Sequence, residues 1–74
     1  MPKIRPGVYL HFKNLKYKVI GEAKHSETLE DYVIYEALYD NPESKIWIRP
    51  KKMFLEKVEI KGKILPRFKY IRPD

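Results

Sequence analysis

The chain has 74 residues, of which 43% are hydrophobic and 14% aromatic, and it contains no cysteine. A chain this short supports only one hydrophobic core, and the lack of cysteine excludes disulfides and thiolate zinc sites as a means of stabilising it. The formal net charge of +6 favours anionic partners. We therefore treat residues 1–74 as a single domain, with residues 1–5 and 72–74 expected to be flexible.

Charge is distributed unevenly along the chain. Between His25 and Ser44 there are six acidic residues and no Lys or Arg, whereas the remainder carries all 16 basic residues against four acids. A basic surface attracts phosphate backbones, but an acidic segment on the same face would repel them. The same pattern also fits ordinary solvated side chains on strand exteriors, and both interpretations remain open.

Hydrophobic alternation with a period of two predicts β-strands throughout, and no stretch shows a convincing helical stripe. The first two predicted strands are Gly7 to Phe12 and Tyr17 to Lys24, joined by a short link into a hairpin. Asn14 lies in that link and can take the left-handed conformation that such a turn may require. We expect Phe12 to face Tyr17 across the turn.

A polar loop separates this hairpin from the rest of the chain. The next predicted elements are the strand Tyr32 to Tyr39, the short strand Ile46 to Arg49, the helical turn Lys51 to Phe54 and the strand Leu55 to Lys61. Turn-forming residues from Asp40 to Ser44 end the third strand, and Pro50 stops the fourth. The Pro-interrupted tail Ile64 to Ile71 is expected to add an edge strand or to pack across the core.

Five short strands with a single-turn helix before the last predict an all-β domain. A small five-stranded antiparallel SH3-like barrel fits better than a sandwich, which needs about seven strands, and an OB-like barrel is the alternative. The residues expected to contribute to the core are Val8, Leu10, Val19, Val33, Tyr35, Ile46, Ile48, Phe54 and Val58. Val33 and Tyr35 lie on the opposite face from Ile34 and Leu38, so one of these two sets must be less buried.

Several motifs with defined spacing run through nearly the whole chain. They are Gly7-x-Tyr9-x-His11-Phe12-Lys13, Tyr17-x-Val19-x-Gly21-x-Ala23-x-His25-Ser26-Glu27-Thr28-x-Glu30, Val33-x-Tyr35-x-x-Leu38-Tyr39, Trp47-x-Arg49-Pro50-x-x-Met53-Phe54-x-Glu56-x-Val58 and Pro66-Arg67-Phe68. In order and spacing they resemble the domain of unknown function 1653 family of small bacterial proteins. Asn14 departs from that pattern, because we expect the family to favour Gly there, and the change affects only the turn. The resemblance implies no established activity.

The two histidines, His11 and His25, lie among acidic residues and suggest a metal site. If the first two strands pair across their link, His25 registers with Ile4, which at about 3.3 Å per residue is roughly 23 Å from His11. We therefore expect no metal site unless the second strand bends sharply back. We also expect no cofactor, and we assign no catalytic residue.

The polar loop carries a group of adjacent hydrogen-bonding side chains: His25, Ser26, Glu27, Thr28 and Glu30. Neighbours in an extended segment point to opposite sides, so His25 is poorly placed to activate Ser26 as a nucleophile. These side chains can satisfy the loop's own backbone N–H groups, or they can present a polar ligand site. The sequence leaves both alternatives open.

Two further pairs of candidate residues each share a strand face, Tyr9 with His11 and Trp47 with Arg49. Trp47 and Arg49 could clamp an anionic or aromatic ligand, or Trp47 could belong to the core while Arg49 pairs with Glu56. Tyr9 and His11 are expected to be exposed or to line a groove suited to single-stranded nucleic acid, the alternative being cross-strand packing.

We also expect the loop His25 to Glu30 to lie beside Trp47 and Arg49 at the mouth of the barrel. There Arg49 would pair with Glu27 or Glu30, and a ligand anion could displace that carboxylate. The reason for this expectation is that these side chains are costly to bury, yet they lie next to strands whose other residues are typical of a hydrophobic core.

The function predicted from these features is a non-catalytic binding module for a polar or anionic ligand such as a nucleotide, nucleic acid or peptide. A chain this short rarely both packs a core and shields a reaction from water, which disfavours the alternative of a small enzyme centred on the loop His25 to Glu30. A third alternative is a homo-oligomer in which the acidic segment of one copy meets the basic surface of another. Nucleic-acid binding would be weak and salt-dependent. Without a signal-peptide or membrane-span pattern, we expect a cytoplasmic protein with no membrane partner.

Overall fold

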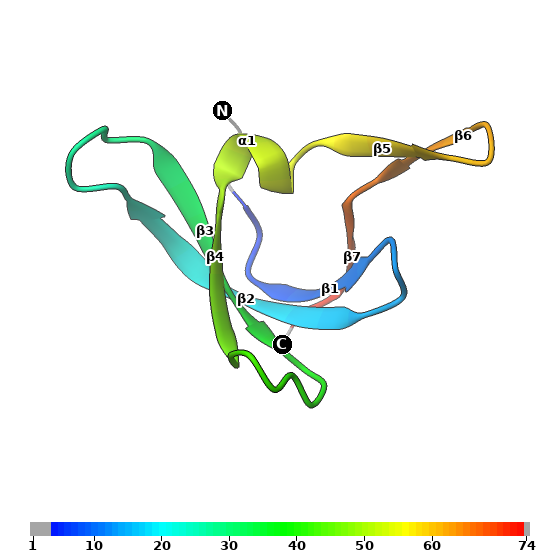
Figure 1. Ribbon diagram of the computed structural model, residues 1–74, viewed down its shortest axis with the longest axis horizontal. Helices are drawn as coiled ribbons and strands as arrows, with labels where there is room; N and C mark the ends of the chain where they lie inside the picture. Colours follow the sequence, from blue (N-terminus) through cyan, green and yellow to red (C-terminus); the bar gives the residue numbers. More distant parts are fainter. Residues whose placement is uncertain (1–3, 74) are drawn as a thin grey trace.

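The computed structural model describes residues 4–73, and strands dominate it (Figure 1). In chain order the elements are β1 (Gly7–His11), β2 (Lys16–Lys24), β3 (Asp31–Ala37), β4 (Ile46–Pro50), α1 (Lys51–Phe54), β5 (Lys57–Ile60), β6 (Lys63–Pro66) and β7 (Phe68–Arg72). One antiparallel sheet has the order β4-β3-β2-β1-β7, and β5 pairs only with β6. The predicted all-β class with a five-stranded antiparallel sheet is confirmed. Over the described residues the sheet is not closed, so the SH3-like barrel and its OB-like alternative stay predictions.

The fifth strand of the sheet comes from the tail rather than from the predicted strand Leu55 to Lys61. That stretch forms β5, which turns back at Gly62, where φ is +79°, into β6. The tail then supplies β7, which pairs with β1 as an edge strand, the first of the two alternatives that the sequence left open. In Figure 1 the β5–β6 hairpin therefore projects away from the sheet as an arm.

The turn between β1 and β2 begins one residue earlier than expected, directly after His11. The register sets Tyr9 opposite Tyr17 and Leu10 opposite Lys16, so the prediction that Phe12 faces Tyr17 is wrong. The His11 N–H donates to the Leu15 carbonyl at 2.7 Å, and Asn14 takes φ of 67°, which is the left-handed conformation predicted for it. Tyr9 and Tyr17 consequently share one face of the sheet.

The core lies on the inner face of the curved sheet and is largely aromatic. Its buried members are Ile4, Tyr9, Val19, Val33, Tyr35, Phe54 and Phe68. Of the predicted core residues, Val8, Val19, Val33, Tyr35 and Phe54 are buried. Val33 and Tyr35 are thus the buried set of β3, whereas Leu38 is exposed and Ile34 only half-buried.

Four predicted core residues are not buried. Ile46 and Ile48 are 48% and 62% exposed, while Leu10 and Val58 are half-buried. The reason for the two isoleucines lies in the register of β4, which sets Trp47 opposite Tyr35 and Arg49 opposite Val33. Residues directly opposite each other share a face, so Ile46 and Ile48 point outwards.

The expectation of flexible ends falls partly on residues 1–3 and 74, which lie outside the described residues. Ile4 is buried in the core cluster, and Arg72 pairs with Val8 at the end of β7. A bulge between Val19 and Gly21 bends β2, and this bend contributes to the curvature of the sheet.

The close approach of β1 and β7 depends on Gly7. Its φ is +144°, and a Cβ placed there would lie 2.6 Å from the Arg72 carbonyl oxygen. We predict that Gly7→Ala lowers the free energy of unfolding by about 1–3 kcal/mol, since both backbone strain and a steric clash oppose it. Gly21→Ala is the matched control, because a Cβ at Gly21 meets no atom within 4 Å. Equal melting temperatures for the two variants would contradict this account of the β1–β7 contact.

Candidate ligand-binding surface

An apolar pocket of about 300 Å³ opens between the N-terminal segment, α1 and β7. Its lining residues are Ile4, Arg5, Tyr9, Phe54, Leu55, Pro66, Phe68 and Tyr70. The Arg5 guanidinium lies 4.7 Å from the centre of the Tyr70 ring, and the Tyr9 hydroxyl donates to the Arg5 carbonyl at 2.7 Å. The pocket therefore combines aromatic walls with one cation held in place by a stacked ring.

A second pocket, of about 170 Å³, shares Pro66 with the first. Its lining residues are Leu10, His11, Phe12, Asn14, Leu65, Pro66 and Lys69. Two more cations, Lys13 and Arg67, lie 6.0 and 5.9 Å from the centre of the Phe12 ring. None of the described residues that line either pocket carries a carboxylate, so both have a positive rim.

His11 is buried rather than exposed, which corrects the prediction for the first strand. Its ring packs edge-on against Phe68 at 4.9 Å, and its Nδ1 accepts the Lys13 N–H at 3.2 Å. Burial lowers the pKa of His11, and the nearby charges of Arg49, Arg67 and Lys13 lower it further. The imidazole is therefore neutral near pH 7, with its proton on Nε2.

Tyr9 is likewise part of the core, with 7% of its surface exposed. Its ring meets Phe54 and Tyr70 edge-on, with both pairs of centroids 5.4 Å apart. Tyr9 and His11 therefore lie on the core-facing side of β1, whereas the sequence predicted that they face away from the core. The ring of Tyr9 still forms part of the wall of the larger aromatic pocket.

Trp47 and Arg49 share a face, as predicted, and both turn towards the core cluster. Trp47 is half-buried against that cluster, and its indole N–H donates to the Ser44 carbonyl at 3.0 Å. The Arg49 Nε donates to the Tyr35 hydroxyl at 3.2 Å, and the guanidinium lies 5.7 Å from the Phe68 ring centre. These contacts favour the alternative in which Trp47 belongs to the core.

Arg49 forms no ion pair with any of its expected carboxylate partners among the described residues. Glu56 pairs with Arg67 at 3.1 Å, and no ion pair among residues 4–73 joins Arg49 to Glu27 or Glu30. Arg49 instead sits among the rings of the core, where the charge is stabilised by a hydroxyl and a π-face.

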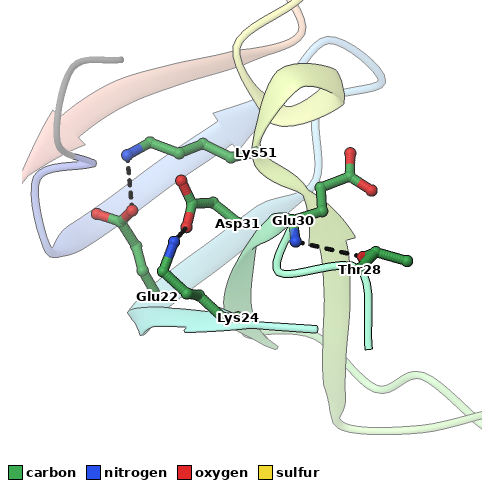
Figure 2. A network of polar contacts seen from close by, with 6 residues as sticks. All are labelled: Glu22, Lys24, Thr28, Glu30, Asp31 and Lys51. Carbon is green, nitrogen blue, oxygen red and sulfur yellow. Dashed lines mark hydrogen bonds and ion pairs between the residues drawn. The ribbon is translucent and has the colours of Figure 1, made fainter. Parts of the chain in front are cut away.

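The polar loop satisfies its own backbone. His25 Nδ1 accepts the N–H groups of Glu27 and Thr28 at 3.2 and 3.3 Å. Thr28 Oγ1 accepts the Glu30 N–H at 3.2 Å (Figure 2). Ser26 and the other loop side chains are exposed, and none of them lines either aromatic pocket. In Figure 1 the loop lies at the left end of the molecule and the β5–β6 arm at the right end. The structure therefore brings Tyr9, His11 and Arg49 around one aromatic cluster and leaves the loop apart from it.

An ion pair between the buried Lys51 and the partly exposed Glu22, which sequence reasoning missed, positions one wall of the larger aromatic pocket. Lys51 is 4% exposed, and its Nζ donates to Glu22 Oε1 at 2.7 Å, while Glu22 Oε2 accepts the Ile4 N–H at 3.0 Å. Figure 2 shows this pair beside the more exposed pair of Lys24 and Asp31. Hydrogen bonds from Lys51 and Ile4 lower the pKa of Glu22. The pair fastens the N-terminal segment, and with it Ile4 and Arg5, to β2 and α1.

No cluster of three His, Cys, Asp or Glu side chains within residues 4–73 is arranged to hold a metal ion. No helix in the described part of the chain is long and apolar enough to cross a membrane.

Comparison with known proteins identifies the family. A family model described as a protein of unknown function (DUF1653) matches residues 7–70. The chain belongs to the DUF1653 family. A crystal structure of a DUF1653 protein from Bordetella bronchiseptica has 34% sequence identity to it and a TM-score of 0.90, with 96% of this chain and 91% of that chain covered. No curated protein matches the sequence. Membership in DUF1653 confirms the resemblance seen in the sequence and carries no activity with it.

The neutral state of His11 predicts a pH-dependent stability. An unfolded histidine takes up a proton below about pH 6.5, whereas the folded chain resists protonation until a lower pH. The free energy of unfolding should therefore fall as the pH drops below 6.5. Denaturant titrations of His11→Asn should show a flatter dependence between pH 7 and 5. An unchanged slope in His11→Asn would contradict the burial argument.

Loss of the Lys51 counter-ion should cost more than loss of an exposed pair. We predict that Glu22→Gln lowers the free energy of unfolding by about 1–3 kcal/mol, because the buried ammonium loses its charged acceptor. Since the pKa of Glu22 is lowered from 4.5, the pair contributes fully above that pH and less as the pH falls through the folded pKa. The difference in free energy of unfolding between the native chain and Glu22→Gln should accordingly become smaller at acidic pH.

Asp31→Asn is the matched control for this pair. It makes the same chemical change at an exposed pair with the same N–O distance of 2.7 Å, and it should leave the stability measurably unchanged. If both variants melt alike, the buried position of Lys51 has no energetic consequence.

Proposed function

We propose that this DUF1653 chain is a binding module for single-stranded nucleic acid. The observation that carries the proposal is the pair of aromatic pockets on either side of Pro66, each with a cation and no carboxylate in its lining. Single strands bind to surfaces that combine positive charge for the phosphates with aromatic rings on which bases stack. A cytoplasmic location is part of this proposal.

The exposed cations of the N-terminal segment, the β1–β2 turn, the β5–β6 arm and β7 define what we call the basic end. They are Arg5, Lys13, Lys57, Lys61, Lys63, Lys69 and Arg72. The carboxylates on the β5–β6 arm and its root are Glu56 and Glu59, and the Arg67 guanidinium contacts Glu56. Positive charge therefore dominates the side of the molecule that carries the arm.

The acidic stretch supports the proposal by its position. It lies in β3 and in the loops on either side of that strand, and in Figure 1 both loops project away from the β5–β6 arm. The repulsion that an acidic segment would exert on phosphates from the same face is thus reduced by distance and screening. The acidic stretch and the basic end therefore occupy different parts of the fold.

The geometry favours tolerant rather than sequence-specific binding. The half-buried rings of Tyr70 and Phe12 offer π-faces, and every base can stack on such a face. The helix α1 has only four residues, so residues 4–73 contain no recognition helix to read the base edges of a duplex. Affinity should rest on charge and stacking and should fall steeply with salt.

Fluorescence anisotropy with labelled single-stranded DNA and RNA at low salt tests the proposal. We expect Lys69→Gln to weaken binding about equally for all sequences and to reduce the slope of log affinity against log salt by about 0.7. Phe12→Leu should weaken binding by about 1–3 kcal/mol, because a base loses its stacking partner. An abasic oligonucleotide of the same length should bind more weakly than the intact one.

Lys52→Gln is the matched control, since Lys52 is an exposed lysine on α1 outside both pockets. It should leave affinity and salt slope almost unchanged. Absence of binding at low salt would remove nucleic acid as the ligand. If abasic and intact strands bind equally, or if heparin binds as tightly as the intact strand, the surface binds polyanions without contacting bases.

A further inference from the structure

The outer edge of β4 pairs with no other strand among the described residues. β4 pairs with β3, and no other described strand lies against it. The Ala37 N–H donates to the Lys45 carbonyl at 2.8 Å. Because hydrogen-bonded pairs alternate along an antiparallel ladder, Trp47 and Arg49 direct their backbone groups to β3. Ile46, Ile48 and Pro50 therefore direct theirs to the open edge.

The side chains at this edge are unusually apolar for a surface. Ile46 and Ile48 are 48% and 62% exposed, and Ile34 lies directly opposite Ile48 on the neighbouring strand. Ile20 on β2 is 49% exposed and continues the strip towards the bulge of β2. A free edge beside an exposed apolar strip is a template for another strand, and isolated proteins normally protect such edges with charge or cover them.

Two features at the ends of β4 define which pairing fits. The Ser44 hydroxyl already donates to the Ile46 carbonyl at 2.8 Å, so this outward acceptor is occupied. Pro50 has no N–H to donate. In an antiparallel pairing of two copies centred on Ile48, Ile46 stands opposite Pro50 of the second copy. The Ile46 carbonyl, which already accepts the Ser44 hydroxyl, then faces Pro50, which has no N–H. Every outward N–H group in this register therefore has an acceptor.

The same register suits the other side chains. The two copies of Ile48 exchange both of their backbone hydrogen bonds at the centre, and Trp47 stands opposite Arg49 of the second copy, which places no like charges opposite each other. A register centred on Trp47 instead sets Lys45 opposite Arg49 of the second copy, which is repulsive. It also requires the carbonyl that Ser44 occupies.

We propose that two copies of this chain associate through their β4 edges about a two-fold axis at Ile48, joining their sheets into one. A second copy is the occupant because the edge is complementary to itself in this register, as an isologous interface must be. The proposal does not rest on nucleic-acid binding. β7 and the basic end lie at the opposite edge of the sheet, so pairing at β4 leaves them free.

Analytical ultracentrifugation of the full chain tests the pairing. We expect a species of twice the chain mass at high concentration that dissociates on dilution. Ile48→Pro removes the outward N–H without touching the bonds to β3, so it should fold and remain monomeric. Ile48→Lys is the second variant, because it sets two like charges against each other on the axis, and it should also be monomeric.

Ile64→Lys is the matched control. It places the same charge at an isoleucine that is 70% exposed on the β5–β6 arm, away from β4, and this variant should still form dimers. A native chain that stays monomeric at concentrations used for NMR would overturn the proposal. So would a dimer that survives both changes at Ile48 or that is lost in Ile64→Lys, since the interface would then lie elsewhere.

Discussion

The stacking of Phe54 on Phe68 is the contact on which the rest of the structure depends. Their rings are 4.2 Å apart and inclined by only 6°, and they join α1 to the start of β7. Between these two residues the chain leaves the core to form the β5–β6 arm. Rings of Tyr9 and Tyr35 pack around the stack. In a chain without disulfides, this aromatic cluster substitutes for the second layer that an open sheet needs over its inner face.

The same stack creates the candidate binding surface. Because Phe68 returns the chain to the sheet directly after Pro66 and Arg67, Pro66 is left between two hollows rather than inside the core. The N-terminal segment closes one hollow because the buried Lys51 holds Glu22, which in turn holds Ile4. Core packing and the pockets are therefore one arrangement, and the arm extends outwards because both of its ends are fixed by that packing.

Period-two alternation predicted nearly all of the strands but not which face of β1 is buried. The pattern predicted that Val8 and Leu10 face the core. Tyr9 and His11 face it instead, because the rings that pack against them come from α1 and β7. A strand with apolar residues on both faces carries no local signal for its phase, and distant rings decide it. Val8 is buried as well, but on the other face, so both sides of this strand exclude water.

The candidate site could be anticipated only in part. Strand faces predicted the pairs Tyr9 with His11 and Trp47 with Arg49, whereas the position of Tyr9 and His11 in the core and the roles of Arg5 and Tyr70 were not predicted. The alternation of rings and cations in the tail, Phe68-Lys69-Tyr70-Ile71-Arg72, was the available signal for a basic aromatic surface. The pair of Lys51 and Glu22 had none, because the partners are 29 positions apart and meet only through the order of strands.

Strand order gives the two edges of the sheet different chemistry. β7 lies beside the basic end. β4 pairs with a strand on one side only, exposes two isoleucines and follows the acidic β3–β4 loop. An end that binds through dispersed charge and stacking binds weakly on its own, because each contact is solvated and shared among many sequences. Joining two chains at β4 places two such ends on one particle, and a strand long enough to reach both binds the second end intramolecularly. Self-association at one edge and weak, tolerant binding at the other would then support each other.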